Sequence, residues 1–217
     1  MIDLHTHTFF SDGELIPSEL VRRAEAYGYK AIAITDHADI SNYDFLISRT
    51  IKVCEKLNEK NRIISIPGIE ITHVHPEHIY ELAKESRKMG AKIIVVHGET
   101  ITEPVLSGTN RKALEADIDI LAHPGLITEE DVKLAAEKGI YVEITARKGH
   151  SITNGHVAAL SKKHGAKMVL NTDLHRPSDL ITIEYARKVL LGAGLPADDC
   201  DEALLNSRKI VEIFHRN

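Results

Sequence analysis

The chain has 217 residues, of which 43% are hydrophobic and 27% charged, and this composition excludes a disordered or fibrous protein. Its net charge of −5 and its lack of tryptophan argue against a nucleic-acid partner, because such binding depends on basic surface and on base stacking. No apolar run reaches the roughly 18–20 residues of a membrane-spanning helix. The unusual feature is the presence of 13 histidines.

Short β-rich runs alternate with longer segments of helical periodicity along the whole chain. The expected strands are rich in Ile and Val on both faces, as buried parallel strands are: Ile2–His5, Ala31–Thr35, Ile63–Ile71, Lys92–Val96, Ile118–Ala122, Ile140–Ile144 and Lys167–Leu170. The expected helices are Pro17–Tyr27, Asp44–Lys60, Pro76–Met89, Gly108–Glu115, Thr128–Lys138, Thr153–His164, Asp179–Leu191, Asp198–Leu205 and Ser207–His215. This alternation predicts one α/β domain over residues 1–217, with a parallel sheet.

The seven expected strands fit either an open doubly wound sheet or a closed barrel, and the polar residues distinguish the two. Six of the strands have His, Asp or Glu at or near their C-terminal ends. In a barrel these ends meet on one face, whereas in an open sheet they spread along an edge. The pattern therefore favours a barrel with its functional site at the C-terminal ends of the strands.

The strand-end residues have the types and the spacing of metal ligands. His5 with His7, and Asp173 with His175, are i, i+2 pairs, whose side chains leave the same face of an extended chain. Imidazole together with carboxylate suits Zn, Mn or Fe. The nine strand-end residues exceed the needs of one ion, so two or three divalent ions are expected: His5, His7, Asp36, His37, Glu70, His97, His123, Asp173 and His175.

Five short motifs resemble those of the PHP family, the polymerase and histidinol phosphatase domains. They are D-L-H-T-H-T-x-x-S-D-G at Asp3–Gly13, I-T-D-H at Ile34–His37, G-I-E at Gly68–Glu70, A-H-P at Ala122–Pro124 and T-D-L-H at Thr172–His175. The resemblance extends over nearly the whole chain. It implies a distorted (βα)7 barrel with a site for two or three metal ions.

The resemblance also assigns ligands to three metal positions. The first position has His5, His7, Glu70 and Asp173; the second has Glu70 as a bridge with His97 and His123; the third has Asp12, His37 and His175. Asp12 lies in an S-D-G loop, so a turn or a helix cap is the alternative role for it. Asp36 is expected to support a neighbouring ligand instead of binding metal itself.

Two arginines are candidates for binding a substrate phosphate. Arg147 follows the sixth strand and emerges on the face of the ligands, where its guanidinium can bind phosphate through two hydrogen bonds; the alternative is a solvated loop charge. Arg176, next to His175, is the weaker candidate. The remaining histidines are expected at the rim or the surface: His73, His75, His78, His150, His156, His164 and His215.

Together these features predict a cytoplasmic, metal-dependent phosphoesterase of small phosphorylated substrates, similar to histidinol phosphatases. A metal-activated hydroxide would attack phosphorus, Glu70 would bridge two ions, and Asp173 or a nearby water would protonate the leaving group. The alternatives are a nuclease of the same family, or a non-catalytic PHP-like module of a nucleoprotein or polymerase assembly. The complete ligand set argues against the module. The sequence leaves the oligomeric state and the identity of the metal open.

Overall fold

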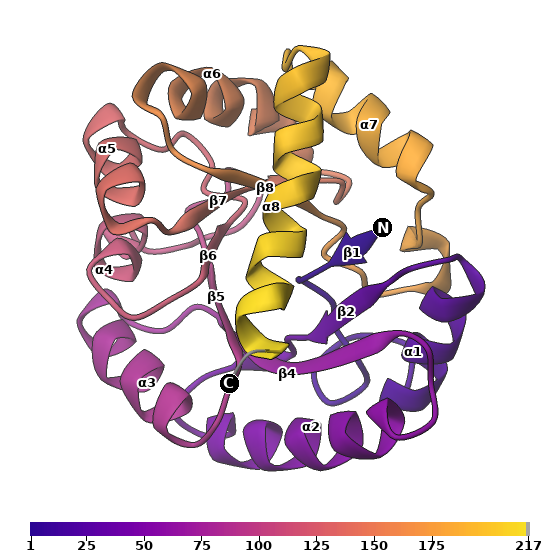
Figure 1. Cartoon of the computed structure of the whole chain (residues 1–217). Helices are drawn as coiled ribbons and strands as arrows, with labels where there is room; N and C mark the ends of the chain where they lie inside the picture. The colour runs from indigo at the N-terminus through magenta and orange to yellow at the C-terminus, as the bar shows by residue number, and fades with distance from the viewer. Residues whose placement is uncertain (216–217) are drawn as a thin grey trace.

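The computed structural model describes residues 1–215 and the side chains as far as Phe214, and its strands form one parallel sheet in the order β1-β2-β4-β5-β6-β7-β8, with β3 beside β4 (Figure 1). The strands are β1 (Ile2–Asp3), β2 (Ala31–Ile34), β3 (His37–Ala38), β4 (Ile64–Ile71), β5 (Ile93–His97), β6 (Ile120–Ala122), β7 (Tyr141–Thr145) and β8 (Met168–Asn171). The α-helices are α1 (Pro17–Ala26), α2 (Tyr43–Asn58), α3 (Pro76–Lys88), α4 (Thr109–Leu114), α5 (Glu129–Lys138), α6 (Asn154–His164), α7 (Ile183–Gly192) and α8 (Ala197–His215). None of these described helices is both long enough and apolar enough to cross a membrane.

The first and last strands meet, so the sheet is nearly closed into a barrel. Thr6 and Leu174 form a parallel bridge, and the backbone N–H of Leu4 donates to Asn171 Oδ1 at 2.9 Å. The predicted barrel of seven parallel strands is therefore confirmed. Strand β1 is shorter than expected. The backbone N–H groups of Leu4 and Thr6 donate to the side chains of Asn171 and Thr35, and not to the backbone of a neighbouring strand.

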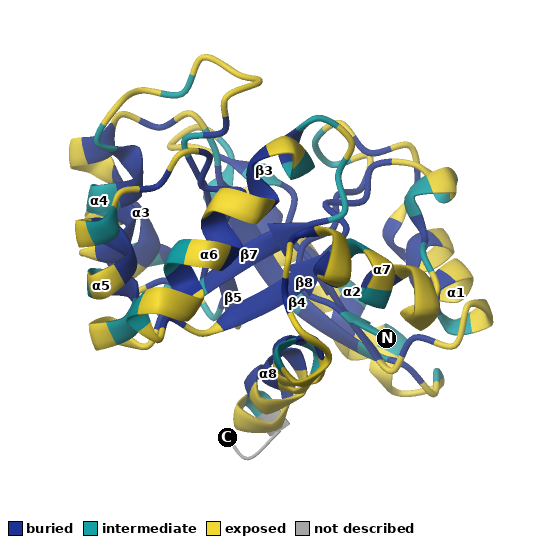
Figure 2. Cartoon of the chain, turned by 90° about the horizontal axis from the view of Figure 1, so that it is seen from above, coloured by how far each residue is buried: buried dark blue, intermediate teal, exposed yellow. Residues whose placement is uncertain are grey.

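The barrel interior is aliphatic, and α8 closes its N-terminal end. Ile210 and Val211 of α8 belong to the same buried cluster as Leu4, Ile93 and Val95 of the strand region. Figure 1 shows α8 lying across this end of the strands, and Figure 2 shows it below them, with β3 and the long loops on the opposite side. The C-terminal ends of the strands are thus left for polar side chains.

The structure differs from the predicted elements most clearly in the C-terminal helices, in the start of α7 and in one strand that was not predicted. The two expected C-terminal helices are one continuous helix, α8, because no Gly or Pro interrupts it and Asn206 donates from its side chain to Met168 O at 3.0 Å. Helix α7 begins at Ile183, four residues later than expected, because Thr182 caps it by accepting from the N–H of Tyr185 at 3.2 Å. The short strand β3 was not predicted, since two residues are too few to show a periodicity.

Two glycines with left-handed backbone allow a matched test of close packing. Gly125 has φ +61°, and an added Cβ would lie 1.8 Å from the backbone oxygen of Glu99. Gly139 has φ +72° with no other atom within 4 Å of such a Cβ. We expect Gly139→Ala to lower the free energy of unfolding by about 1–2 kcal/mol, through backbone strain alone. Gly125→Ala should lower it by at least about 3 kcal/mol, because overpacking is added to strain. Urea denaturation measures both changes, and equal losses would contradict the packing argument.

Candidate metal centre

The structure brings the predicted ligands together in one cluster at the C-terminal ends of the barrel strands. Their ligand atoms form overlapping groups, in each of which all atoms lie within 4.8 Å of one another. The groups are His5, His7 and Glu70; His5, His123 and Asp173; Glu70, His97 and His123; and His7, Asp12, His37 and His175. All but Asp12 and His37 are buried.

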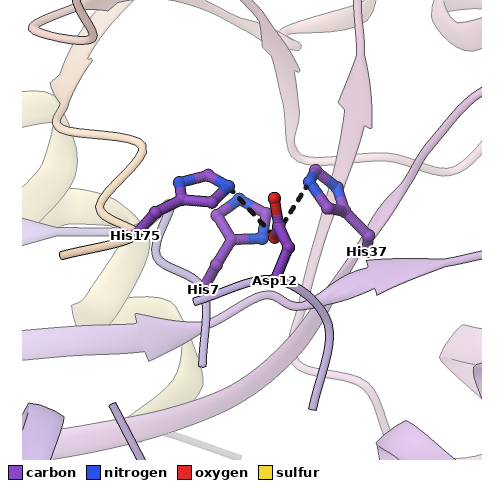
Figure 3. A group of neighbouring side chains, drawn as sticks. All are labelled: His7, Asp12, His37 and His175. Carbon is purple, nitrogen blue, oxygen red and sulfur yellow. Dashed lines mark ion pairs between the residues drawn. The ribbon is translucent and has the colours of Figure 1, made fainter. Parts of the chain in front are cut away.

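The imidazole–carboxylate spacings in the cluster match those of two ligands on one ion. His5 Nε2 lies 3.2 Å from Glu70 Oε1. His175 Nε2 lies 3.1 Å from Asp12 Oδ1, and Figure 3 shows these two side chains turned toward each other with His37 on the other side of the carboxylate. Two donors bonded to a tetrahedral ion at about 2.0–2.1 Å are separated by about 3.3 Å. The arrangement therefore leaves the right space for an ion between the side chains.

Glu70 occupies the middle of the cluster. Its Oε1 lies 3.2 Å from His5 Nε2 and 3.6 Å from His123 Nε2. Its Oε2 lies 2.7 Å from His37 Nδ1 and 3.7 Å from His7 Nε2. Because the carboxylate faces two different groups of ligands, its position suits the bridging role that the sequence predicts.

Several buried atoms of the cluster have no hydrogen-bond partner, so they are available to bind a metal ion. They are His5 Nε2, His7 Nδ1 and Nε2, Glu70 Oε1 and His123 Nδ1. A buried polar atom without a partner costs about 1–3 kcal/mol, so native proteins keep few of them. Divalent ions would bind the Nε2 and carboxylate atoms among them, and the donor set therefore fits a metal centre.

The protonation states of His7 and Asp12 suit metal binding, whereas the pKa values of His5, His37 and His97 are raised because neighbouring carboxylates outweigh burial. Burial lowers the pKa of His7 to about 3, so its imidazole is neutral at physiological pH. Burial alone would raise the pKa of Asp12, but the hydrogen bond from His175 and the charges of the neighbouring imidazoles outweigh it and lower this pKa to about 2. Neutral imidazole and ionised carboxylate are the forms that bind a metal ion.

A buried carboxylate orients His5 from behind. Glu143 Oε1 accepts hydrogen bonds from His5 Nδ1 at 2.9 Å and from the Asn171 side chain at 2.9 Å. Glu143 Oε2 accepts from the backbone N–H of His123 at 3.1 Å. Because Nδ1 is engaged by Glu143, the Nε2 atom of His5 is the one that faces the cluster.

Asp36 supports the site by holding a loop, and the same loop places Asp12. Asp36 accepts hydrogen bonds from the backbone and hydroxyl of Thr8, both at 2.7 Å, and from the hydroxyl of Ser11 at 2.8 Å. The loop then directs Asp12 toward His37 and His175. Asp12 does not cap helix α1, because the residue at the N-cap is Ile16 and no side chain caps that end.

The only non-glycine residues with positive φ in the described chain lie at this end of the barrel. They are His73 at +53°, His123 at +25° and Asp173 at +51°. Such conformations cost about 1–3 kcal/mol each and persist where surrounding structure holds them, often at functional sites. Two of the three are predicted metal ligands, so the strain is located at the candidate centre.

Comparison with known proteins identifies the family. The model of the PHP domain matches residues 3–150. This chain is a PHP-domain protein. It is 52% identical over 95% of its length to an uncharacterized protein of Methanocaldococcus jannaschii, covering 96% of that protein. It is 25% identical over 98% of its length to a "probable phosphatase" of Clostridium acetobutylicum, covering 93% of it.

Solved structures share the fold of this PHP-domain protein at low sequence identity. A chain in archaeal ribonuclease P with mature tRNA superposes with a TM-score of 0.76 at 17% identity, with 98% of this chain and 90% of that chain covered. The histidinol phosphate phosphatase of Lactococcus lactis, in complex with zinc, L-histidinol and phosphate, superposes with a TM-score of 0.62 at 18% identity. The superposition covers 90% of this chain and 94% of that chain. These likenesses show the fold, and the resemblance to the PHP family that the motifs predict is confirmed.

Two residues at the site of the PHP-domain protein were not predicted. His150, expected at the surface, is buried; its ring stacks on that of His123, with centroids 4.3 Å apart. Glu103 lies 3.2 Å from His97 Nε2. The hydrogen bond with His97 lowers the pKa of Glu103 to about 2, so the carboxylate is ionised. Neither residue belongs to a motif or ends a strand, so their location depends on loops whose path the sequence pattern does not show.

Of the other histidines outside the motifs, His73 lies beside His97 of the cluster, with ring centroids 5.0 Å apart. His73 is exposed at the rim, as expected, and its Nε2 lies 3.2 Å from Glu103 Oε2. His75, His78 and His156 are also exposed, and His164 is half-buried. The side chain of His215 is outside the described residues.

A cavity of about 370 Å³ opens onto the cluster, and the two candidate arginines differ in their relation to it. Arg147 lines this cavity, and its Nη1 donates to Asp173 O at 3.2 Å and to Asp179 Oδ2 at 3.4 Å. Arg176 does not line it; its exposed guanidinium pairs with Glu14 at 3.2 Å. The geometry thus places Arg147 nearer to a substrate bound at the cluster.

The central position of Glu70 predicts an unequal loss of metal among single variants. Glu70→Ala should remove a ligand from two metal positions, so two ions should bind more weakly than in the wild type. His123→Ala should weaken the binding of one ion only. Metal content after dialysis, measured by inductively coupled plasma mass spectrometry, distinguishes these results. Loss of one ion in both variants would show that Glu70 does not bridge.

Proposed function

We propose that this PHP-domain protein is a metal-dependent phosphoesterase. The observation that carries the proposal is the set of buried imidazole and carboxylate atoms, spaced for shared ions, of which several have no hydrogen-bond partner. Divalent ions held there would activate a water molecule and neutralise charge on a phosphoryl group. The phosphatase name of the Clostridium relative and the zinc, histidinol and phosphate in the Lactococcus structure support this chemistry.

Arg147 is the residue proposed to bind the phosphoryl oxygens. Among the described residues, the hydrogen bonds of its guanidinium all use Nη1. Because a guanidinium has five N–H donors, the remaining groups can bind two oxygens of a phosphate. The contacts with Asp173 and Asp179 fix the orientation of the side chain at the cavity wall, which reduces the entropy lost on binding.

Asp173 fits the role of a metal ligand better than that of a proton donor. Burial would raise its pKa, but the charge of His5 and the nearby His7 imidazole, whose Nε2 lies 3.2 Å from Asp173 Oδ1, outweigh burial and hold this pKa far below the usual range. A general acid must bring a proton to the leaving group, and an ionised Asp173 has none. We therefore propose that Asp173 binds metal and, through its backbone oxygen, positions Arg147.

Removal of the Arg147 guanidinium tests the proposal. Arg147→Ala should lower kcat/KM for a phosphomonoester by roughly 10–100-fold, about 1.4–2.7 kcal/mol, the range of a charge-assisted hydrogen bond. Metal content should stay at the wild-type level, and Arg147→Lys should recover only part of the activity, because an ammonium lacks the planar fork. Arg176→Ala, in which the lost side chain lies outside the cavity, should have the smaller effect. Wild-type kcat/KM for Arg147→Ala would exclude the role.

A second candidate substrate is a nucleic acid, and a neighbouring cavity favours it. This cavity, of about 780 Å³, shares Arg147 with the metal-site cavity and is also lined by Lys148, Arg176, Tyr27 and Tyr185. Cations that bind phosphates, together with aromatic rings that stack on bases, are typical of single-strand binding. The ribonuclease P likeness supports this candidate. The net charge of −5 averages over the whole surface and therefore does not exclude such a local group of cations.

A comparison of two substrates separates the candidates. If the cavity binds a nucleic-acid strand, Tyr185→Ala should raise KM for a short oligoribonucleotide by about 5–160-fold, since a stacked base contributes about 1–3 kcal/mol. The same variant should hydrolyse p-nitrophenyl phosphate at the wild-type rate, because this ester is too small to reach the tyrosine. An oligoribonucleotide that is not hydrolysed, or whose KM is unchanged in Tyr185→Ala, would leave small phosphoesters as the substrates.

A further inference from the structure

Glu103 lies among three imidazoles at the outer edge of the metal centre. It belongs to the loop between β5 and α4, and its Oε2 lies 3.2 Å from His97 Nε2 and 3.2 Å from His73 Nε2. Its Oε1 lies 3.4 Å from His150 Nε2. The side chain is 39% exposed, so its position is not a consequence of burial. Instead, several polar contacts hold it.

The metal position next to Glu103 has three assigned protein ligands, one fewer than the position of His5, His7, Glu70 and Asp173. By the motif assignment it has Glu70, His97 and His123, whereas zinc sites are usually four-coordinate. His97 Nδ1 hydrogen-bonds with Gly98 O at 3.1 Å, so His97 Nε2 is the atom that faces both the cluster and Glu103. The separation of 3.2 Å between His97 and Glu103 equals that between His5 and Glu70.

The loop is anchored so that this carboxylate is presented to the centre. His150 Nδ1 hydrogen-bonds with the hydroxyls of Thr100 at 2.7 Å and Thr102 at 3.0 Å, on the N-terminal side of Glu103. On the other side, Glu99 Oε1 accepts from the backbone N–H groups of Gly108 at 3.0 Å and Asn110 at 2.9 Å. These contacts fix both ends of the loop, as ligand-bearing loops require.

We propose that Glu103 is a further metal ligand, which the β5–α4 loop supplies to the ion position that contains His97. The inference rests on the proposed metal centre and takes the same class of ion, a divalent transition metal. His73 and His97 lie with Glu103 in a group whose ligand atoms are within 4.8 Å of one another. His73 acts as a positioning residue, because its Nε2 contacts the same carboxylate oxygen from the solvent side.

The role of Glu103 has a consequence for substrate binding. A catalytic ion needs one position that a substrate oxygen can occupy. Glu103 is partly exposed and lies on a loop, whereas Glu70 is fully buried on a strand. The Glu103 carboxylate is therefore the ligand that an incoming phosphoryl oxygen can displace, while Glu70 stays in place.

The test is a zinc titration of the metal-free full-length chain in competition with a chromophoric chelator. Glu103→Gln keeps the size of the side chain but removes its charge. It should weaken the binding of one ion by more than roughly 10–100-fold, the loss typical of a residue that only supports a ligand, while the other ions bind as in the wild type. In the cobalt-loaded protein the visible absorption of that ion should also shift. His73→Ala should lower the affinity for the same ion by a smaller factor.

Two matched controls isolate the effect. Glu130→Gln changes an exposed carboxylate and His78→Ala an exposed imidazole outside the cluster, and both should bind zinc and cobalt as the wild type does. Wild-type zinc affinity and an unchanged cobalt spectrum in Glu103→Gln would overturn the inference while leaving the phosphoesterase proposal in place. A wild-type chain that binds no zinc would overturn both.

Discussion

The burial of imidazole and carboxylate groups that have no partners within the protein is the constraint on which the rest of the structure depends. His5, His7, Glu70 and His123 together place five such atoms in the barrel mouth, at a cost of about 1–3 kcal/mol for each atom. The left-handed backbone of His123 and Asp173 adds strain at the same place. Divalent ions bound to the Nε2 and carboxylate atoms among them would offset part of these costs. The aliphatic interior and the closure by α8 stabilise the barrel whose strand ends hold these groups in place.

Much of the fold could be predicted because each strand and helix shows a pattern within a short stretch of sequence. Buried parallel strands such as β5 are continuous apolar runs, and predicted ligands such as His97 follow directly from where those runs end. The placement of Asp12 could not be decided from its S-D-G loop, because it depends on hydrogen bonds between that loop and Asp36, which come from different parts of the chain. The roles of Glu103 and His150 depend on contacts between two loops, which leave no periodicity in the sequence.

The fold alone does not select the substrate, since phosphatases and a ribonuclease P component share it. The choice of substrate would depend on the loops at the C-terminal end of the barrel. The cavity over the cluster has room for a phosphoryl group and a small leaving group, and Arg147 joins it to the larger cavity beside α7. A substrate that extends past Arg147 would meet Tyr185 and Arg176, whereas a small phosphomonoester would not. By the proposal, Arg147 would take part in either mode of binding, and the residues beyond it would distinguish a small phosphoester from a nucleic-acid strand.

The most direct test of the central claim is anomalous X-ray diffraction from crystals grown with zinc or manganese. The account predicts two or three anomalous peaks, each at about 2.0–2.2 Å from its donor atoms, within the group of His5, His7 and Glu70, the group of Glu70, His97 and His123, and the group of Asp12, His37 and His175. An absence of peaks among these side chains at saturating metal, with the nitrogen and oxygen atoms still unpaired, would contradict it.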